Sequence, residues 1–170
     1  MYTERLLLRR FTLDDAAAYL PLVADPAILR YTGEAALTSV DAAREILQTR
    51  PLRDYQVHGF GRMACIERAS GRLIGFCGLK YLDEIQEVDI GYRFLPACWG
   101  KGYASESAAA LLAQAFELYQ LPRVIGLVQP DNLASAQVLK KLGLQYETSI
   151  DHVDGTPTYD VYALERAQSA

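Results

Sequence analysis

The stretch FLPACWGKGYASES, residues 94–107, sets two glycines around a lysine, between an apolar run and an alanine-rich run. Alternating apolar residues over 87–95 predict a strand, and the Ala, Leu and Glu content of 103–118 predicts a helix. The start of a helix has unpaired N–H groups and a partial positive charge, and glycines let phosphate oxygens approach the main chain. The stretch therefore predicts an anion site to which Lys101 adds charge, the alternative being a tight turn that binds nothing.

Two familiar phosphate motifs do not fit this loop. A dinucleotide fold needs a third glycine where Ser105 stands, and it needs the loop after the first strand of the chain. A P-loop needs Ser or Thr directly after the lysine, where Gly102 stands. Neither of these two motifs therefore explains the loop.

The pattern on both sides of the loop predicts a mixed sheet with helices on its faces. Before the loop we expect a strand, two helices and three strands, which are listed as residues 4–11, 12–24, 38–47, 60–68, 72–82 and 87–95. After it we expect a helix, a strand, a helix and two strands, listed as 103–118, 123–129, 130–143, 144–150 and 158–166. This order predicts one α/β (α+β) domain over residues 1–170, with about seven strands and about four helices.

Composition narrows the class of protein. A net charge of −4 argues against a nucleic-acid partner, and no apolar run is long enough to span a membrane. The charged start MYTERLLLRR does not fit a signal peptide, so we expect a cytoplasmic protein. Three cysteines without a C-x-x-C pair and two distant histidines predict neither a disulfide framework nor a metal site.

The segment VDIGYRFLPACWGKGYASE, residues 88–106, resembles the acetyl-CoA-binding stretch of the GNAT N-acetyltransferase superfamily. That family's loop is Arg/Gln-x-x-Gly-x-Gly/Ala; Gly102 and Ala104 match it, while Trp99 stands where Arg or Gln is usual. The opening TERLLLRRFTLDDA and the segment VQPDNLASAQVLKKLGL resemble the branch that contains the ribosomal-protein N-terminal acetyltransferases. Matches in one order along most of the chain imply a GNAT-like fold and acetyl-CoA as co-substrate.

The resemblance implies which residues hold the coenzyme. Main-chain amides from Gly100 to Ser105 would bind its diphosphate, and the strand edge at Phe94 and Leu95 would pair with its pantetheine arm. Asn132 would contact that arm, with a plain helix cap as the alternative. The implied cofactor-binding set is Phe94, Leu95, Trp99, Gly100, Lys101, Gly102, Tyr103, Ala104, Ser105, Asn132 and Lys141, the last as a partner for the ribose phosphate.

The resemblance also implies direct attack of a substrate amine on the thioester. A carboxylate is needed because amines are mostly protonated at neutral pH, and Asp89 is the first choice for this base, with Glu87 second. A main-chain N–H near Leu95 would stabilise the oxyanion. The family's usual tyrosine position holds Leu139, and the resemblance to the ribosomal-protein branch implies Ser135 as the proton donor to the leaving thiolate. Each acid has the alternative of being an ordinary surface group.

The acceptor is left open between a protein N-terminal α-amine and a small amine or amino acid. The acids at residues 83–89 would suit a cationic acceptor, and residues 24–39 and 149–158, with Tyr31 and His152, would line its pocket. A non-catalytic acyl-CoA sensor is the alternative function, and a homodimer is left open.

Overall fold

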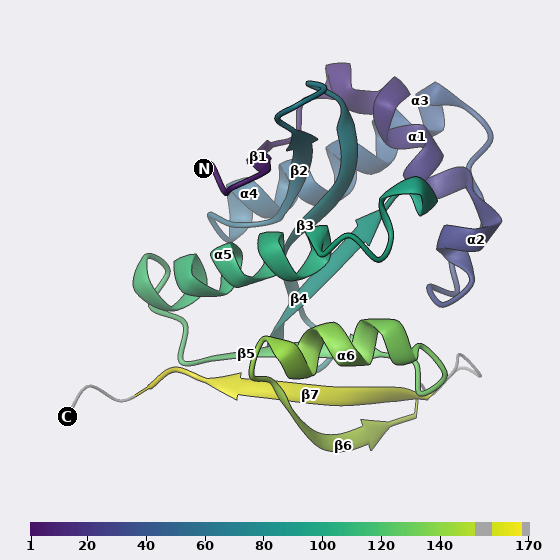
Figure 1. Ribbon diagram of the computed structural model, residues 1–170. Coiled ribbons are helices and arrows are strands. Elements are labelled where there is room, and N and C mark those ends of the chain that lie inside the picture. Colours follow the sequence, from purple (N-terminus) through teal and green to yellow (C-terminus); the bar gives the residue numbers. More distant parts are fainter. Residues whose placement is uncertain (152–157, 168–170) are drawn as a thin grey trace.

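The computed structural model describes residues 1–151 and 158–167, which form a mixed sheet with helices on both faces (Figure 1). Its seven strands lie in the order β1-β2-β3-β4-β5-β7-β6, and β4 with β5 is its parallel pair. The strands are β1 (Leu6–Arg10), β2 (Arg62–Glu67), β3 (Leu73–Leu82), β4 (Glu87–Phe94), β5 (Arg123–Val128), β6 (Gln145–Ile150) and β7 (Tyr159–Glu165). The α/β fold expected from the sequence is confirmed.

Helices cover both faces of the sheet. The α-helices are α1 (Ala16–Ala24), α2 (Pro26–Leu29), α3 (Val40–Leu47), α4 (Arg53–Val57), α5 (Tyr103–Glu117) and α6 (Leu133–Lys141). Short turns of 3-10 helix, η1 (Leu13–Asp15) and η3 (Pro96–Cys98), and a π-helical turn, η2 (Gln48–Leu52), join them. Helices α1 and α3 pack on one face, and α5 and α6 pack on the other.

Local sequence explains where the first helices begin. Thr12 and Asp15 form a capping box, in which the Thr12 N–H donates to Asp15 Oδ2 at 2.8 Å. Ser39 caps α3, since its hydroxyl accepts the N–H of Ala42 at 3.1 Å. These caps satisfy N–H groups that a helix start leaves unpaired.

Two helical segments were not predicted. Residues 48–57 continue α3 through η2 into α4, and the wider π-helical turn accommodates Pro51 inside the run. Residues 26–29, expected to be a loop, form a short helix in which Asp25 accepts the Ala27 N–H at 2.8 Å. The sequence also predicts a turn at Asp154-Gly155 between the two closing strands, and these two residues lie outside the described residues.

Alternation along β4 builds a separate core on each face of the sheet. Val88, Ile90 and Phe94 are buried against α5 and α6, as the sequence pattern predicts. Arg93 points to the opposite face, where its Nη1 donates to the Leu22 carbonyl of α1 at 3.2 Å. The side chains of the odd-numbered residues of β4 therefore lie on the face of the sheet that carries α1, and those of the even-numbered residues lie on the face that carries α5 and α6.

The parallel pair β4–β5 opens into a split. Their ladder contains one register pair, Asp89 with Ile125, and the two strands then diverge toward their C-terminal ends. Figure 1 shows that α5 and α6 both begin at the edge where β4 and β5 end. Two helix N-termini therefore lie beside the mouth of this split.

Candidate active site

The glycine loop presents an open helix N-terminus. Gly100 and Gly102 have φ of +71° and +82°, in the left-handed region that L side chains rarely adopt, so both glycines are required by the turn. Gly102 is the N-cap of α5, and no side chain among the described residues caps that end. The N–H groups of Tyr103, Ala104 and Ser105 thus face outward with the positive end of a 15-residue helix. This geometry fits a diphosphate.

Arg5 holds the loop from behind. Its Nη1 donates to the Lys101 carbonyl at 2.8 Å, its Nε donates to Glu106 Oε2 at 2.7 Å, and its guanidinium lies 4.4 Å from the centre of the Tyr103 ring. Burial alone would raise the pKa of Glu106, but hydrogen bonds from Thr3 and Arg5 lower this pKa overall. The acid in the first turn of α5 is therefore turned away from the anion site.

Tyr103 contributes to the site through its main chain. Its hydroxyl donates to Glu67 Oε1 at 2.6 Å, and its ring stacks on Phe94 with 6.1 Å between centroids. The sequence predicts Tyr103 at the coenzyme. In the structure its side chain packs behind the loop, against Glu67 and Phe94. The sequence carries no signal for the contacts of Arg5, because Lys101 and Glu106 lie 96 and 101 positions away from it.

The edge of β4 at the mouth is partly occupied. The Leu95 N–H donates to Ile74 of β3 at 2.9 Å, so the alternation of the ladder turns the N–H and C=O of Phe94 toward the split. The Phe94 carbonyl accepts the indole Nε1–H of Trp99 at 2.7 Å. Trp99, 51% exposed, therefore covers the carbonyl that the pantetheine arm is expected to use.

The two candidate bases have different surroundings. Asp89 is 7% exposed; its Oδ2 lies 2.6 Å from Arg62 Nη2, and its Oδ1 accepts the Leu127 N–H at 3.1 Å. Glu87 lies two residues, or about 7 Å, before Asp89 along β4, where β4 and β5 have not yet separated. Its carboxylate pairs with Nε of Arg123 at 3.0 Å. The structure thus brings Asp89 to the split and ties Glu87 into an ion cluster behind it.

A pair of hydroxyls joins β4 to α6 beside the split. Ser135 Oγ donates to Tyr92 Oη at 3.0 Å, and Tyr92 Oη donates to the Ser135 carbonyl at 2.9 Å. Burial raises the pKa of Tyr92 well above its usual range, so its hydroxyl is protonated. Asn132 caps α6 by accepting the Ser135 N–H at 3.2 Å, which leaves the two donors of its amide for a ligand. The sequence pattern counts Tyr92 only as an apolar-face residue and misses its hydroxyl.

Two expected contributions lie elsewhere. Lys141 ends α6, about 13 Å along the helix axis from Asn132, so the structure does not bring it to the loop. Asp83 and Glu84 lie in the turn before β4, about 23 Å of strand away from Phe94. Asp83 and Glu84 therefore lie away from the mouth of the split, whereas Asp89 of the same acidic segment lies at the split.

The acceptor-side segment, residues 24–39, is anchored by one acid between two bases. Glu34 pairs with Arg93 of β4 at 2.8 Å and with Arg50 of η2 at 2.7 Å. Burial alone would raise the pKa of Glu34, but Arg93 and Arg50 lower it overall. Tyr31 lies under the guanidinium of Arg30 at 5.2 Å, and His152 lies outside the described residues.

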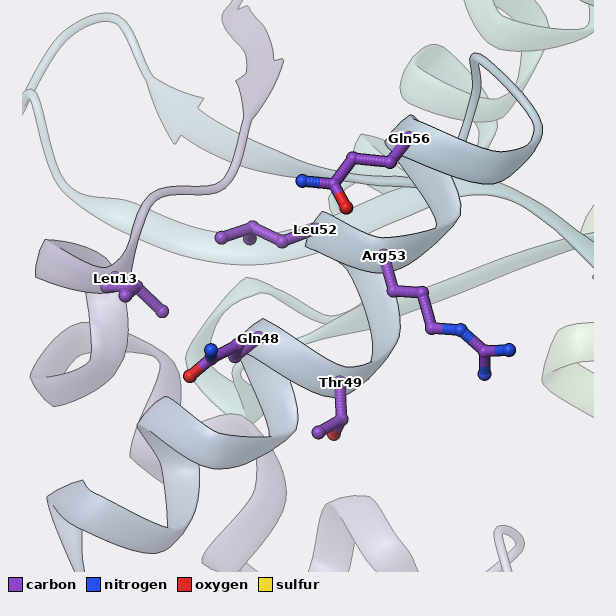
Figure 2. Close-up of a pocket in the computed structure, with 6 residues that line it drawn as sticks. All are labelled: Leu13, Gln48, Thr49, Leu52, Arg53 and Gln56. Atoms are coloured by element: carbon purple, nitrogen blue, oxygen red, sulfur yellow. The ribbon is translucent and has the colours of Figure 1, made fainter.

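A pocket of about 490 Å³ lies away from this site, against the helical run from α3 to α4 (Figure 2). It is lined by Leu13, Gln48, Thr49, Leu52, Arg53 and Gln56. None of these residues belongs to β4, β5 or the glycine loop. This pocket is therefore separate from the split and from the glycine loop.

Comparison with known proteins fixes the family. Residues 5–145 match the acetyltransferase (GNAT) domain. The chain belongs to the GNAT acetyltransferase family. It is 34% identical over 149 residues to the N-acetyltransferase p20 of Bacillus licheniformis, covering 86% of this chain and 83% of that one. As a member of this family, this chain is an acetyltransferase that depends on acetyl-CoA. Its membership favours catalysis over the alternative of a sensor.

Solved structures agree with this assignment. A GNAT acetyltransferase from Bacillus anthracis superposes with a TM-score of 0.81 at 28% identity, covering 98% of both chains. A ribosomal L7/L12 α-N-protein acetyltransferase, RimL, in complex with coenzyme A has a TM-score of 0.80 at 20% identity, covering 96% of this chain and 95% of that one, which shows the shared fold. No helix among residues 1–151 and 158–167 is long and apolar enough to cross a membrane.

Proposed function

We propose that this acetyltransferase moves an acetyl group from acetyl-CoA to the α-amino group of a peptide or an amino acid. The observation that carries the proposal is the open N-terminus of α5, with its two left-handed glycines, at the mouth of the β4–β5 split. Amides of residues 100–105 hold the diphosphate, and Lys101 adds a full positive charge. A ligand anchored there has its arm directed along β4 toward Asp89.

Main-chain groups of β4 position the reactive end. The N–H and C=O of Phe94 face the split, and the amide donors of Asn132 lie on its other side. Because the Leu95 N–H is already bonded to Ile74, the oxyanion donor predicted near Leu95 is the Phe94 N–H. Trp99 leaves the Phe94 carbonyl when the pantetheine arm pairs with it.

The transfer needs two proton movements besides the change of bonds. The base takes one proton from the ammonium group, and the neutral nitrogen then forms a bond to the thioester carbon as the carbon–sulfur bond breaks to give a thiolate. The nitrogen loses its second proton to become the amide; Ser135 Oγ gives a proton to the sulfur and is restored by that second proton. Tyr92, hydrogen-bonded to Ser135, orients the hydroxyl. A thiol pKa near 8.5 makes this help modest at neutral pH.

Removal of the proton from the amine remains a prediction for Asp89, with Glu87 second. Both carboxylates are ion-paired, to Arg62 and to Arg123 respectively. A water next to Asp89 would carry the proton, since the residue is 7% exposed and each carboxylate oxygen keeps a lone pair beside its hydrogen bond.

The charge around the mouth favours an α-amine over a polyamine. The cluster of Glu34 with Arg50 and Arg93 carries two guanidiniums and one carboxylate, and the acids at residues 83 and 84 lie far away. A net positive surface repels acceptors with several ammonium groups. An α-amine, with a pKa near 8, also loses its proton more easily than a lysine-type amine near 10.4.

An acceptor panel tests the proposal. Release of free thiol from acetyl-CoA is measured with short peptides with free N-termini, the same peptides N-acetylated, free amino acids and spermidine. We expect turnover with the free α-amines and none with the blocked peptides. Faster turnover with spermidine than with any α-amine refutes the acceptor class, while absence of turnover on every amine refutes the proposed reaction.

A further inference from the structure

We infer that Asp89 is a positioning residue: its carboxylate takes the N–H that would continue the β4–β5 ladder, and so holds the split open for the coenzyme. The inference rests on the proposed function, because it assumes that the coenzyme lies in the split. It assigns Asp89 a role that the sequence-based prediction of a catalytic base does not contain. The argument starts from the register of β4.

Main-chain directions along β4 show which bond is missing. The Leu95 N–H points to β3. By alternation, the main-chain N–H and C=O groups of the odd-numbered residues of β4 point to β3, and those of the even-numbered residues point to β5. Ile125 pairs opposite Asp89, and the next residue of β5 that faces β4 is Leu127. In a continued parallel ladder its N–H would bond to the Ile90 carbonyl. It bonds to Asp89 Oδ1 at 3.1 Å instead.

This change of hydrogen-bond acceptor, from a main-chain carbonyl to a side-chain carboxylate, moves β5 out of the plane of the ladder. The Asp89 side chain stands on the face of the sheet that carries Arg93, so a bond to its carboxylate draws Leu127 toward that face. The strands separate from this residue onward, and the mouth of the separation is where α5 begins. One carboxylate therefore lies at the apex of the split.

Arg62 fixes the carboxylate in this position. Its Nη2 donates to Asp89 Oδ2 at 2.6 Å, and its Nη1 donates to the Gly78 carbonyl. The guanidinium fills the space that Gly91 leaves, because a Cβ at Gly91 would lie 2.4 Å from Arg62 Nη2. Gly91 in the interior of a strand thus serves the close approach of a charged group. The two side chains of the pair are 19% and 10% exposed.

Substitution separates this role from that of a base. A base needs a carboxylate that can receive a proton, and Asp89 keeps lone pairs for one beside its two hydrogen bonds, so its contacts allow both roles. A positioning residue needs only an acceptor oxygen for Leu127. Asparagine keeps that oxygen and loses the charge, whereas alanine loses both. The two variants therefore differ in coenzyme binding if Asp89 is a positioning residue, and lose activity alike if it is a base.

The experiment compares Asp89→Asn, Asp89→Ala and Gly91→Ala with the wild type. Coenzyme A affinity is measured by calorimetry, kcat and KM by thiol release over pH 6–9, and protection of the Leu127 amide by hydrogen exchange in the free protein. We expect Asp89→Ala and Gly91→Ala to raise the Kd for coenzyme A about tenfold or more, as for loss of a hydrogen bond to a charged group. Asp89→Asn should bind more tightly than Asp89→Ala and keep the acid limb of the pH profile.

Two results overturn the inference. Wild-type coenzyme affinity in Asp89→Ala, with kcat falling about 10²–10⁴-fold in both Asp89 variants, would assign the residue to general base catalysis. Unchanged exchange of the Leu127 amide in a folded Asp89→Ala protein would show that the carboxylate does not hold the strand. Failure of the wild type itself to bind coenzyme A refutes the proposed function, and is thereby distinguished from failure of the inference.

Discussion

The strongest test of the anion site is Gly102→Glu. A non-glycine residue at φ +82° costs roughly 1–2 kcal/mol, while the added Cβ meets nothing closer than Arg5 Nη2 at 3.4 Å, so crowding contributes little. Repulsion between the new carboxylate and a phosphate near 4 Å adds up to about 4 kcal/mol at an effective dielectric of 20. The strain lowers the stability of the free and the bound protein alike, so the repulsion alone changes binding and raises the Kd for coenzyme A up to about 10³-fold.

Calorimetry at two salt concentrations measures this change, and Gly59→Glu is the matched control. Gly59 has φ +78°, and a Cβ there also meets nothing within 4 Å. It lies next to Phe60, which contacts Tyr119 beyond the far end of α5. We expect near wild-type affinity in the control, a loss in Gly102→Glu that shrinks as salt screens the charge, and at most about tenfold loss in Gly102→Ala. A Kd for Gly102→Glu within about threefold of the control would remove the loop from the site.

Three further outcomes follow from the described contacts. Ser135→Ala should lower kcat about 10–100-fold without changing the Kd for coenzyme A, and Tyr92→Phe should lower it less, which steady-state kinetics will separate from a binding defect. Trp99 is the single tryptophan, so titration with coenzyme A should change its fluorescence as the indole leaves the Phe94 carbonyl; an unchanged spectrum at saturation contradicts that movement. Burial alone would raise the pKa of Asp15, but bonds from Arg9 and Thr12 lower it in the folded state, so its stabilisation is complete above about pH 3.9 and is lost as the pH falls through the folded-state pKa. Thermal melts from pH 6 to 3 should therefore show a shallower acid dependence in Asp15→Asn than in the wild type.

The order of elements and the glycine loop could be predicted from the sequence because both depend on local patterns. Alternation over residues 87–95 and the Gly-Lys-Gly turn need no knowledge of distant residues. Ion-pair partners are different. The contact of Arg62 with Asp89 spans 27 positions, and that of Arg5 with Lys101 spans 96, and side-chain type alone does not select a partner at such separations.

Some signals were present and were not used. Gly91 in the interior of β4 marks the close approach of another group, which the structure shows to be Arg62. The helix across Pro51 had no such signal, because proline normally ends a helix and a π-helical turn depends on the packing around it. The position of Asp83 and Glu84 also had no signal, because composition gives the charges of a segment without the direction of its turn.

Arg123 has a consequence for the mechanics of the whole sheet. From β5 it pairs with Glu87 of β4, Glu147 of β6 and Glu165 of β7, behind the point where β4 and β5 separate. The strands β1–β4 and the group β5, β7 and β6 are thus joined firmly at one end and by few main-chain bonds at the other, so they can pivot about this cluster. A molecule lying between them bonds to both groups, and it should slow amide exchange in strands that it never touches.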